Sequence, residues 1–532
     1  MTRRHDAIVI GGGHNGLTCA AYLARAGKRV LVLERRHIVG GAAVTEEVVP
    51  GFRFSVFSYL MSLLHPKVIA DLDLRRHGFV VLPATDMFGP LPGGDGIIFS
   101  DDVARTQRHF SRFSRRDAAI YPEFDRYLME SVAVMRKLLL ATPPDPSCRS
   151  WRAFRRTAAF LWEYRRYGGR LFRLVDLLTM SADDYLSEWF ESTHVKAVLA
   201  YYCGIGTFVG PKSPGSAYVV MHHLMGEHAG AGGWGFVRGG MGAISDAIAA
   251  AAREKGAEIV TGAEVVGIDT RDGRATGVSL ADGSRHEADV VVSNVSAKLT
   301  YLRMLKREQL PAELVRDVES YRTYSTAFKI NIACERLPQY TGFRPEEAGF
   351  DYPTYTHIGP SIEYLERAYD DAKYGDMSRN PFITPVTPTH VDDTLAPPGK
   401  HVVNLFGGHA PYSLRDGDWT TRREELVGNV LRVIDEHAPG FSDGIIGMQV
   451  LTPPDIEAKI GSPHGHIFHG ELQIDQLFWA RPAPHWADYR TPIRNLYLCG
   501  SSAHPGGGVG AVVGHNAARE ILRDWRRRDR RR

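Results

Sequence analysis

Cysteine is scarce in this chain, with five residues among 532 and none of the CxxC spacings that mark zinc sites or redox pairs. We therefore expect no disulfide framework, no metal site and a reducing compartment. A surplus of charge of one sign is also missing, because 64 lysines and arginines face 61 aspartates and glutamates. The net charge of +3 excludes a global attraction to nucleic acid, so nucleic acid is not an expected partner.

Long apolar runs are absent as well. The sequence has no stretch of about 18 apolar residues, which argues against a membrane-spanning helix. Residues 1–6 lead directly into an apolar strand and lack the apolar segment and cleavage site of a secretory signal. The expected location is the cytoplasm. With 44% hydrophobic residues over 532 positions, the chain can form more than one core.

The clearest pattern lies near the N-terminus. An apolar run at residues 7–10 is followed by a glycine-rich turn at 11–16 and an apolar helical periodicity at 17–24. A second apolar run, 30–33, ends at Glu34. Strand, glycine turn, helix and strand make a βαβ unit with the fingerprint of a dinucleotide-binding site.

Each glycine of this turn has a physical task. Gly11 permits the tight turn, Gly13 lets the backbone approach a pyrophosphate, and Gly16 lets the helix pack closely on the strand. The start of the helix supplies unpaired N–H groups and the positive end of its dipole. Glu34 would accept hydrogen bonds from ribose hydroxyls.

The rest of the chain indicates an α/β fold. We expect a discontinuous Rossmann-type dinucleotide-binding domain formed by residues 1–100, 231–300 and 455–532, which the family resemblance described below makes an FAD-binding domain. Residues 101–230 are mainly helical in pattern and predict a helical cap. Residues 301–454 carry strands separated by proline-rich loops and predict a mixed sheet that completes the substrate domain.

Two segments carry a family resemblance. GGGHNGLTCAAYLARAGKRVLVLERRHIVGGAA near the N-terminus and LYLCGSSAHPGGGVGAVVGHNAAREIL near the C-terminus resemble FAD enzymes of the amine oxidase and phytoene desaturase superfamily. Intermediate stretches such as VRGGMGAISDAIAAAAREKGAEI resemble one subgroup, the pyridine nucleotide-disulfide oxidoreductase domain-containing protein 2 group. The likeness spans almost the whole chain.

The resemblance implies FAD as the cofactor, with the adenine at the backbone of Val265 and the start of the last helix at the flavin. Ala42 departs from the arginine that amine oxidases commonly carry after the GG pair, which argues against an amine oxidase. The residues implied at FAD are Gly11, Gly13, His14, Asn15, Gly16, Glu34, Arg35, Gly40, Gly41, Ala42, Val265, Gly500, Ser501, Gly510, Ala511 and Val512.

The catalytic candidates are one lysine and three histidines. Lys329 lies in the apolar strand TAFKINIAC, and amine oxidases hold a lysine in their substrate-domain sheet, bridged by water to flavin N5. The alternative is an edge-strand lysine whose amine reaches solvent. His222, His223 and His469 are candidates for proton transfer, with satisfied core histidines as the alternative.

The predicted reaction is dehydrogenation (desaturation) or isomerisation of a largely apolar organic substrate, with hydride transfer to flavin N5. One alternative is a flavin oxidase of a small polar amine or alcohol. Another is an FAD-holding interaction protein without turnover. A second nucleotide fingerprint is not supported at Gly240–Gly242, so oxygen or a quinone is the expected electron acceptor.

A basic and aromatic segment remains outside these assignments. Residues 151–178 contain seven arginines, and Trp151, Phe154 and Leu161 share one helical face. This face favours either peripheral contact with an anionic membrane or an ordinary solvated cap helix. The tail 525–532 is expected to be a frayed basic end. The sequence does not determine the oligomeric state.

Overall fold

The computed structural model describes residues 4–147, 151–226, 233–324 and 327–530. Its core is a large sheet whose central strand is β1 (His5–Ile10), paired in parallel with β2 (Val30–Glu34) on one side and β12 (Arg285–Ser293) on the other. Two further parallel strands complete this part, β9 (Glu258–Thr261) beside β2 and β17 (Leu496–Leu498) beside β12. The central strands are buried and almost uniformly apolar, as strands covered on both faces must be. The predicted βαβ unit is confirmed.

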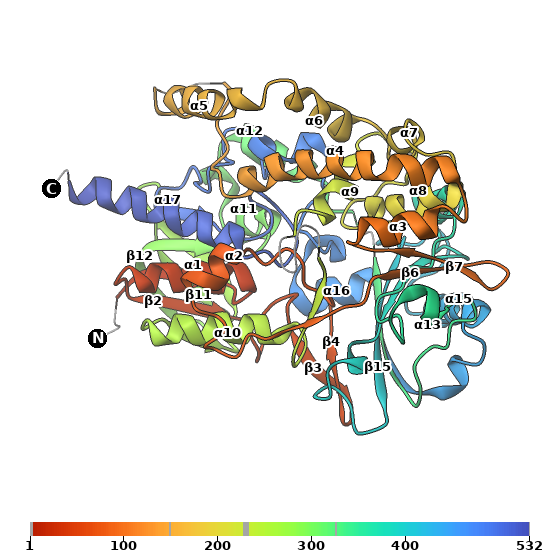
Figure 1. The fold of residues 1–532 in the computed structure, drawn as a ribbon. Coiled ribbons are helices and arrows are strands. Elements are labelled where there is room, and N and C mark those ends of the chain that lie inside the picture. Colours follow the sequence, from red (N-terminus) through yellow and green to blue (C-terminus); the bar gives the residue numbers. More distant parts are fainter. Residues whose placement is uncertain (1–3, 148–150, 227–232, 325–326, 531–532) are drawn as a thin grey trace.

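Three helices cover one face of this sheet. Helix α1 (His14–Arg25) packs between α10 (Gly242–Glu254) and α17 (Val512–Asp529) (Figure 1). The approach of α17 is close, because a Cβ on Gly514 would lie 2.0 Å from the backbone oxygen of Asn15. Helix α17 continues to Asp529, so the basic tail predicted to be frayed is helical up to that residue.

Residues 258–271 contain two strands that lie at opposite edges of the sheet. After β9 the chain turns at Gly262, whose φ is +69°, and continues as β10 (Val265–Arg271). Strands β10 and β11 (Arg274–Leu280) pair antiparallel and extend the sheet beyond β12. The strand-like pattern of residues 258–269 shows no break in the sequence. The positive φ of Gly262 lets the chain turn there and separates β9 from β10.

The second sheet is antiparallel, in the order β14 (Phe382–Val386), β15 (His401–Gly408), β13 (Phe328–Cys334) and β16 (Ile445–Leu451). On one face, apolar side chains of β13 and β15 pack against α15 (Arg423–His437). Because side chains alternate along a strand, Lys329 and Asn331 point to the other face. The strand predicted in TAFKINIAC begins at Phe328 in the structure, and residues 325–326 lie outside the described residues.

Residues 101–230 were predicted to be mainly helical, and their described part consists mainly of helices. Its helices form a layer along the top of Figure 1 and share one core with aromatic residues that border the second sheet. They are α3 (Val103–Phe110), α4 (Arg115–Leu139), α5 (Trp151–Tyr164), α6 (Arg170–Thr179), α7 (Ala182–Ser187), α8 (Thr193–Ala200) and α9 (Ser216–His223), with 3-10 turns at Arg165–Tyr167 and Tyr201–Gly204.

Shorter elements connect these layers. The strands are β3 (Thr45–Val49), β4 (Phe52–Ser55), β5 (Val81–Pro83), β6 (Met87–Leu91), β7 (Asp95–Phe99) and β8 (Gly235–Val237). The helices are α2 (Pro66–Asp71), α11 (Ala297–Leu302), α12 (Ala312–Ser320), α13 (Pro345–Ala348), α14 (Ile362–Lys373) and α16 (Pro453–Ile460). None of the described helices is long and apolar enough to cross a bilayer.

Four of the cysteines, Cys19, Cys203, Cys334 and Cys499, are buried free thiols, and Cys148 lies outside the described residues. Within the described part of the chain, no group of three His, Cys, Asp or Glu side chains is placed to hold a metal ion.

Candidate active site

A cavity of about 610 Å³ lies at the carboxyl ends of the parallel strands and extends to the second sheet. Its wall includes Glu34 and Val265 at one end and Lys329 and Phe406 at the other. The carboxyl edge of a parallel sheet is where α/β folds bind ligands, because the loops there leave a crevice.

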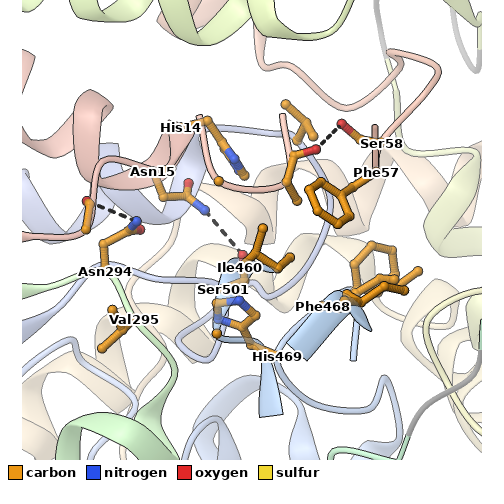
Figure 2. Close-up of a pocket in the computed structure, with 18 of the residues that line it drawn as sticks. His14, Asn15, Phe57, Ser58, Asn294, Val295, Ile460, Phe468, His469 and Ser501 are labelled. Atoms are coloured by element: carbon orange, nitrogen blue, oxygen red, sulfur yellow. Dashed lines mark hydrogen bonds between the residues drawn. The ribbon is translucent and has the colours of Figure 1, made fainter. Parts of the chain in front are cut away.

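The glycine turn forms part of this wall. A Cβ on Gly16 would lie 2.3 Å from the backbone oxygen of Gly11, and one on Gly13 would lie 2.8 Å from Asn294 Nδ2. Asn294 Nδ2 donates a hydrogen bond to Gly11 O at 3.2 Å (Figure 2). The N-cap of α1 is Gly13, which supplies no side-chain cap, so the helix start can receive an anionic ligand.

Glu34 ends β2 and is buried beside the turn. Its Oε2 accepts a hydrogen bond from Gly12 N at 2.7 Å, and its Oε1 accepts one from Arg36 N at 2.9 Å. The carboxylate therefore also fixes the backbone of the glycine turn, a role that the sequence did not indicate. Next to it, Arg35 Nη2 donates to Ala458 O at 3.0 Å, which joins α16 to this end of the cavity.

The C-terminal segment closes on the same turn. Asn15 Nδ2 donates to Ser501 Oγ at 3.4 Å, and Gly514 N donates to Asn15 Oδ1 at 3.4 Å. Figure 2 shows Asn15 and Ser501 facing each other across the cavity wall. A Cβ on Gly500 would lie 2.3 Å from Asn294 O, so a glycine is required there. Segments almost 500 residues apart thus form one wall.

The residues expected at the cofactor divide into two groups. Those that line the cavity are Gly11, Gly13, His14, Asn15, Glu34, Arg35, Gly41, Ala42, Val265 and Ser501. The others, which support the lining turns without being lining residues, are Gly16, Gly40, Gly500, Gly510, Ala511 and Val512.

The end of the cavity near the second sheet is an aromatic chamber, which we define by Tyr59, Tyr202, Trp234, Tyr355 and Phe406. Tyr59 and Phe406 stack with ring centroids 5.7 Å apart, and Tyr202 and Trp234 stack at 6.1 Å. The hydroxyls of Tyr202 and Tyr355 are 3.0 Å apart and share a hydrogen bond. Flat apolar groups pack well against the free faces of such rings.

Lys329 reaches the chamber from β13, an interior strand of its sheet, and only 2% of the residue is exposed. The edge-strand alternative is therefore wrong, because the amine stays inside the protein. Its Nζ donates to Asn331 Oδ1 at 2.6 Å and lies 5.5 Å from the ring centroid of Tyr59. Burial away from water lowers the pKa of Lys329 well below its usual value, which favours the neutral amine.

Two of the three candidate histidines line the cavity, His223 and His469. The ring of His223 stacks on Tyr202 at 5.5 Å, and its Nδ1 is 2.9 Å from Val219 O, which leaves Nε2 as the acceptor. Burial lowers the pKa of His223 and of His469 to about 4. His222 is buried behind the wall, and neither ring nitrogen has a hydrogen-bond partner among the described residues.

A buried arginine supports the loop that carries His469. Arg481 is fully buried, and its guanidinium donates to Ser501 O at 2.8 Å and to Phe468 O at 2.9 Å. Its positive charge adds to burial in lowering the pKa of His469. A further hydrogen bond, 2.9 Å long, goes to Glu471 O. Carbonyl oxygens thus hold a fixed cation behind the cavity wall.

Sequence reasoning missed part of the lining. Asn294 follows the buried strand β12, and a polar residue at the end of an apolar run was a usable signal. The five aromatic residues of the chamber lie in separate loops, a 3-10 turn and a strand, without a shared motif. Only the fold brings them together.

The cavity has the character of a dinucleotide site that continues into a reaction chamber. Its glycine turn leaves space that a Cβ would fill, and two buried nitrogens on its wall, His14 Nε2 and His469 Nδ1, have no partner within the described chain. These features fit FAD, whose pyrophosphate needs backbone approach and whose ring system needs polar contacts. The protein is therefore a flavin-dependent oxidoreductase.

The comparisons with known proteins name the family. The family described as flavin containing amine oxidoreductase matches residues 16–439, so the chain belongs to this family and its cofactor is FAD. "Pyridine nucleotide-disulfide oxidoreductase domain-containing protein 2" of Mus musculus is 41% identical, over 98% of this chain and 94% of that protein. "Phytoene desaturase (lycopene-forming)" of Pantoea ananas is 26% identical, over 95% of this chain and 96% of that protein.

A solved structure shows the same fold. An oxidoreductase from Methanosarcina mazei aligns with a TM-score of 0.62 over 97% of this chain and 99% of its own, at 18% identity. The α/β fold with an FAD-binding part, expected from the sequence, is confirmed.

Proposed function

We propose that the protein dehydrogenates (desaturates) or isomerises a neutral, largely apolar organic substrate held in the aromatic chamber. When bound, FAD supplies the hydride acceptor, flavin N5. The domain assignment stays as the sequence predicted it, with residues 101–230 and 301–454 enclosing the substrate. Oxygen or a quinone is the proposed electron acceptor, and the proposed location is the cytoplasm, in peripheral contact with a membrane.

One observation carries the proposed substrate class. Among the described lining residues, the carboxylates Glu34, Glu264 and Glu457 all lie at the end of the cavity near Arg35 and Val265. The aromatic chamber offers an ammonium ion no carboxylate partner, while burial favours neutral Lys329 and neutral histidines. Moving an unpaired cation into such a chamber is costly, whereas a neutral ring gains by leaving water.

The cofactor roles follow the geometry. We propose that the glycine turn and the start of α1 hold the pyrophosphate, that Glu34 binds the ribose, and that the backbone of Val265 meets the adenine. Ser501 and the segment before α17 complete the flavin end. Lys329, His223 and His469 remain as proton-transfer candidates, because they line the cavity. His222 stays in the proposal only as a group packed against His223, at 5.4 Å between ring centroids.

The substrate class can be tested with matched compounds. Under nitrogen, a panel of cyclic alkenes and alcohols is compared with amines of the same carbon skeletons, and flavin absorbance is followed. We expect bleaching by neutral members and none by the amines at neutral pH. Bleaching by amines alone would favour the polar-substrate oxidase, and no bleaching by a broad panel would favour an FAD-holding interaction protein.

Substitution of Lys329 tests its role in proton transfer. Lys329→Met keeps the length of the side chain and removes the amine, so we expect reoxidation by oxygen to slow by about 100-fold with substrate reduction nearly intact. Stopped-flow absorbance measures the two half-reactions separately. Lys373→Met, at an exposed ion pair with Asp370, is the control and should change neither. If Lys329→Met and the parent protein are reoxidised at equal rates, the amine has no role in this step.

A further inference from the structure

The segment formed by α5 and α6 exposes an unusual amount of apolar surface. Of the 13 large hydrophobic side chains that are exposed in the described chain, six lie between residues 151 and 175. Trp162 is 67% exposed and Phe172 is 76% exposed, and the rings of Trp151 and Phe154 stack on each other at 5.3 Å. Apolar patches of this kind usually mark an interaction surface. The six are Trp151, Phe154, Leu161, Trp162, Phe172 and Val175.

An arginine-rich groove borders α5. It lies between α5, the loop before β17 and the C-terminal turns of α17. Its exposed arginines are Arg155, Arg274, Arg494, Arg527 and Arg528. The one carboxylate among its described lining residues, Asp524, already accepts a hydrogen bond of 2.7 Å from Arg490. The groove is therefore positively charged.

Two hydrogen bonds of Arg156 fix the orientation of α5. Arg156 Nη2 donates to Glu520 at 2.6 Å, and its Nη1 donates to Asp488 at 2.9 Å. These bonds tie α5 to the elements around α17, and Trp151 at the start of α5 lines the arginine-rich groove itself. Figure 1 shows α5 above α17, on the side of the molecule where the C-terminus lies. Trp151, which stacks on Phe154, therefore places exposed aromatic surface directly beside the groove arginines. We call the six exposed apolar side chains and the groove arginines together the basic-aromatic face.

We propose that this basic-aromatic face docks on the surface of an anionic phospholipid bilayer. Tryptophan and phenylalanine enter the boundary between headgroups and acyl chains, and arginine forks bind lipid phosphates. Charge complementarity favours an anionic bilayer, and the exposed aliphatic side chains Leu161 and Val175 favour lipid over a nucleic acid. The inference rests on the proposed peripheral contact and not on the proposed reaction.

The test is co-sedimentation of the FAD-loaded protein with vesicles. One set is phosphatidylcholine alone and the other contains about 30% phosphatidylglycerol. We expect binding to the anionic set only, and loss of most binding when salt rises to about 0.5 M. Trp162→Ala combined with Phe172→Ala, and separately Arg527→Ala combined with Arg528→Ala, should each weaken binding by about tenfold. Tyr374→Ala, at a residue that is 68% exposed and follows α14, is the matched control.

Separate measurements of folding, reaction and binding distinguish the ways in which the experiment could fail. Flavin absorbance and melting temperature show that the variants are folded, and bleaching by a soluble substrate shows that the reaction is unaffected. Equal sedimentation with both vesicle sets, or no effect of either double variant, would overturn the proposal. If anionic vesicles leave the protein in solution and ultracentrifugation shows a dimer that the tryptophan variant dissociates, the face is an interface between two copies. Release of the protein from vesicles by single-stranded RNA at low salt would likewise count against lipid.

Discussion

Gly16→Ala is expected to yield protein that purifies without FAD. The added Cβ would lie 2.3 Å from Gly11 O and 3.0 Å from the side chain of Asn294. Because the backbone oxygen of Gly11 cannot move without opening the turn, α1 must shift away from β1, and the N–H groups at its start move with it. We expect FAD affinity to fall by about 100-fold or more.

Absorbance of the purified protein and titration with FAD measure this effect. Gly428→Ala is the matched control, because Gly428 lies in helix α15 with no atom within 4 Å of the added Cβ. It should keep its FAD, and its melting temperature should be equal or slightly higher, because alanine favours a helix more than glycine does. Circular dichroism shows whether Gly16→Ala remains folded. A folded Gly16→Ala protein that retains FAD would contradict the role assigned to the turn.

Glu520→Gln is expected to destabilise the protein by about 3–5 kcal/mol, the usual loss when one partner of a buried ion pair is removed. The side chain of Glu520 is fully buried and pairs with Arg156 at 2.6 Å and Arg490 at 2.8 Å. Glutamine keeps the shape but removes the charge that balances both guanidinium groups. Urea unfolding followed by flavin release and circular dichroism gives the loss. Glu363→Gln, from an exposed pair with Arg367, should change stability by at most about 1 kcal/mol.

The same residue sets a pH dependence. Burial alone would raise the pKa of Glu520, but the charges of Arg156 and Arg490 outweigh it and lower this pKa below its ordinary 4.5. A carboxyl whose pKa is lower in the folded state stabilises the protein above about pH 4.5 and loses this contribution as the pH falls toward the folded value. The parent protein should therefore lose stability below about pH 4.5 more steeply than Glu520→Gln. Parallel slopes would contradict the pairing.

Local patterns predicted the cofactor half of the site. The glycine turn, Glu34 and the C-terminal glycine-rich segment are contiguous signals, because a pyrophosphate imposes backbone conformations on neighbouring residues. The family predicted from these segments is confirmed, and so are the β1–α1–β2 unit and the mainly helical character of the described part of residues 101–230.

The reaction chamber could not be predicted in the same way. Tyr59, Trp234 and Phe406 are far apart in the sequence, and each occupies a context in which an aromatic residue is ordinary. Lys329 was a candidate because a charge in an apolar strand is rare, but its burial depends on β13 having a neighbour on each side. His222 and His223 are adjacent in sequence, and only the packing of α9 separates the one at the cavity from the one behind it.

The packing of α17 against α1 can form only late in biosynthesis. Asn15 is made early, whereas its partners Ser501 and Gly514 are made after nearly the whole chain. At about 5–20 residues per second, roughly 25–100 seconds separate the two events on a ribosome. During that interval β1 and α1 lack the helix that later covers them, so the nascent N-terminal segment has an unsealed apolar face. A cavity wall that includes Ser501 is therefore complete only after nearly the whole chain has been synthesised.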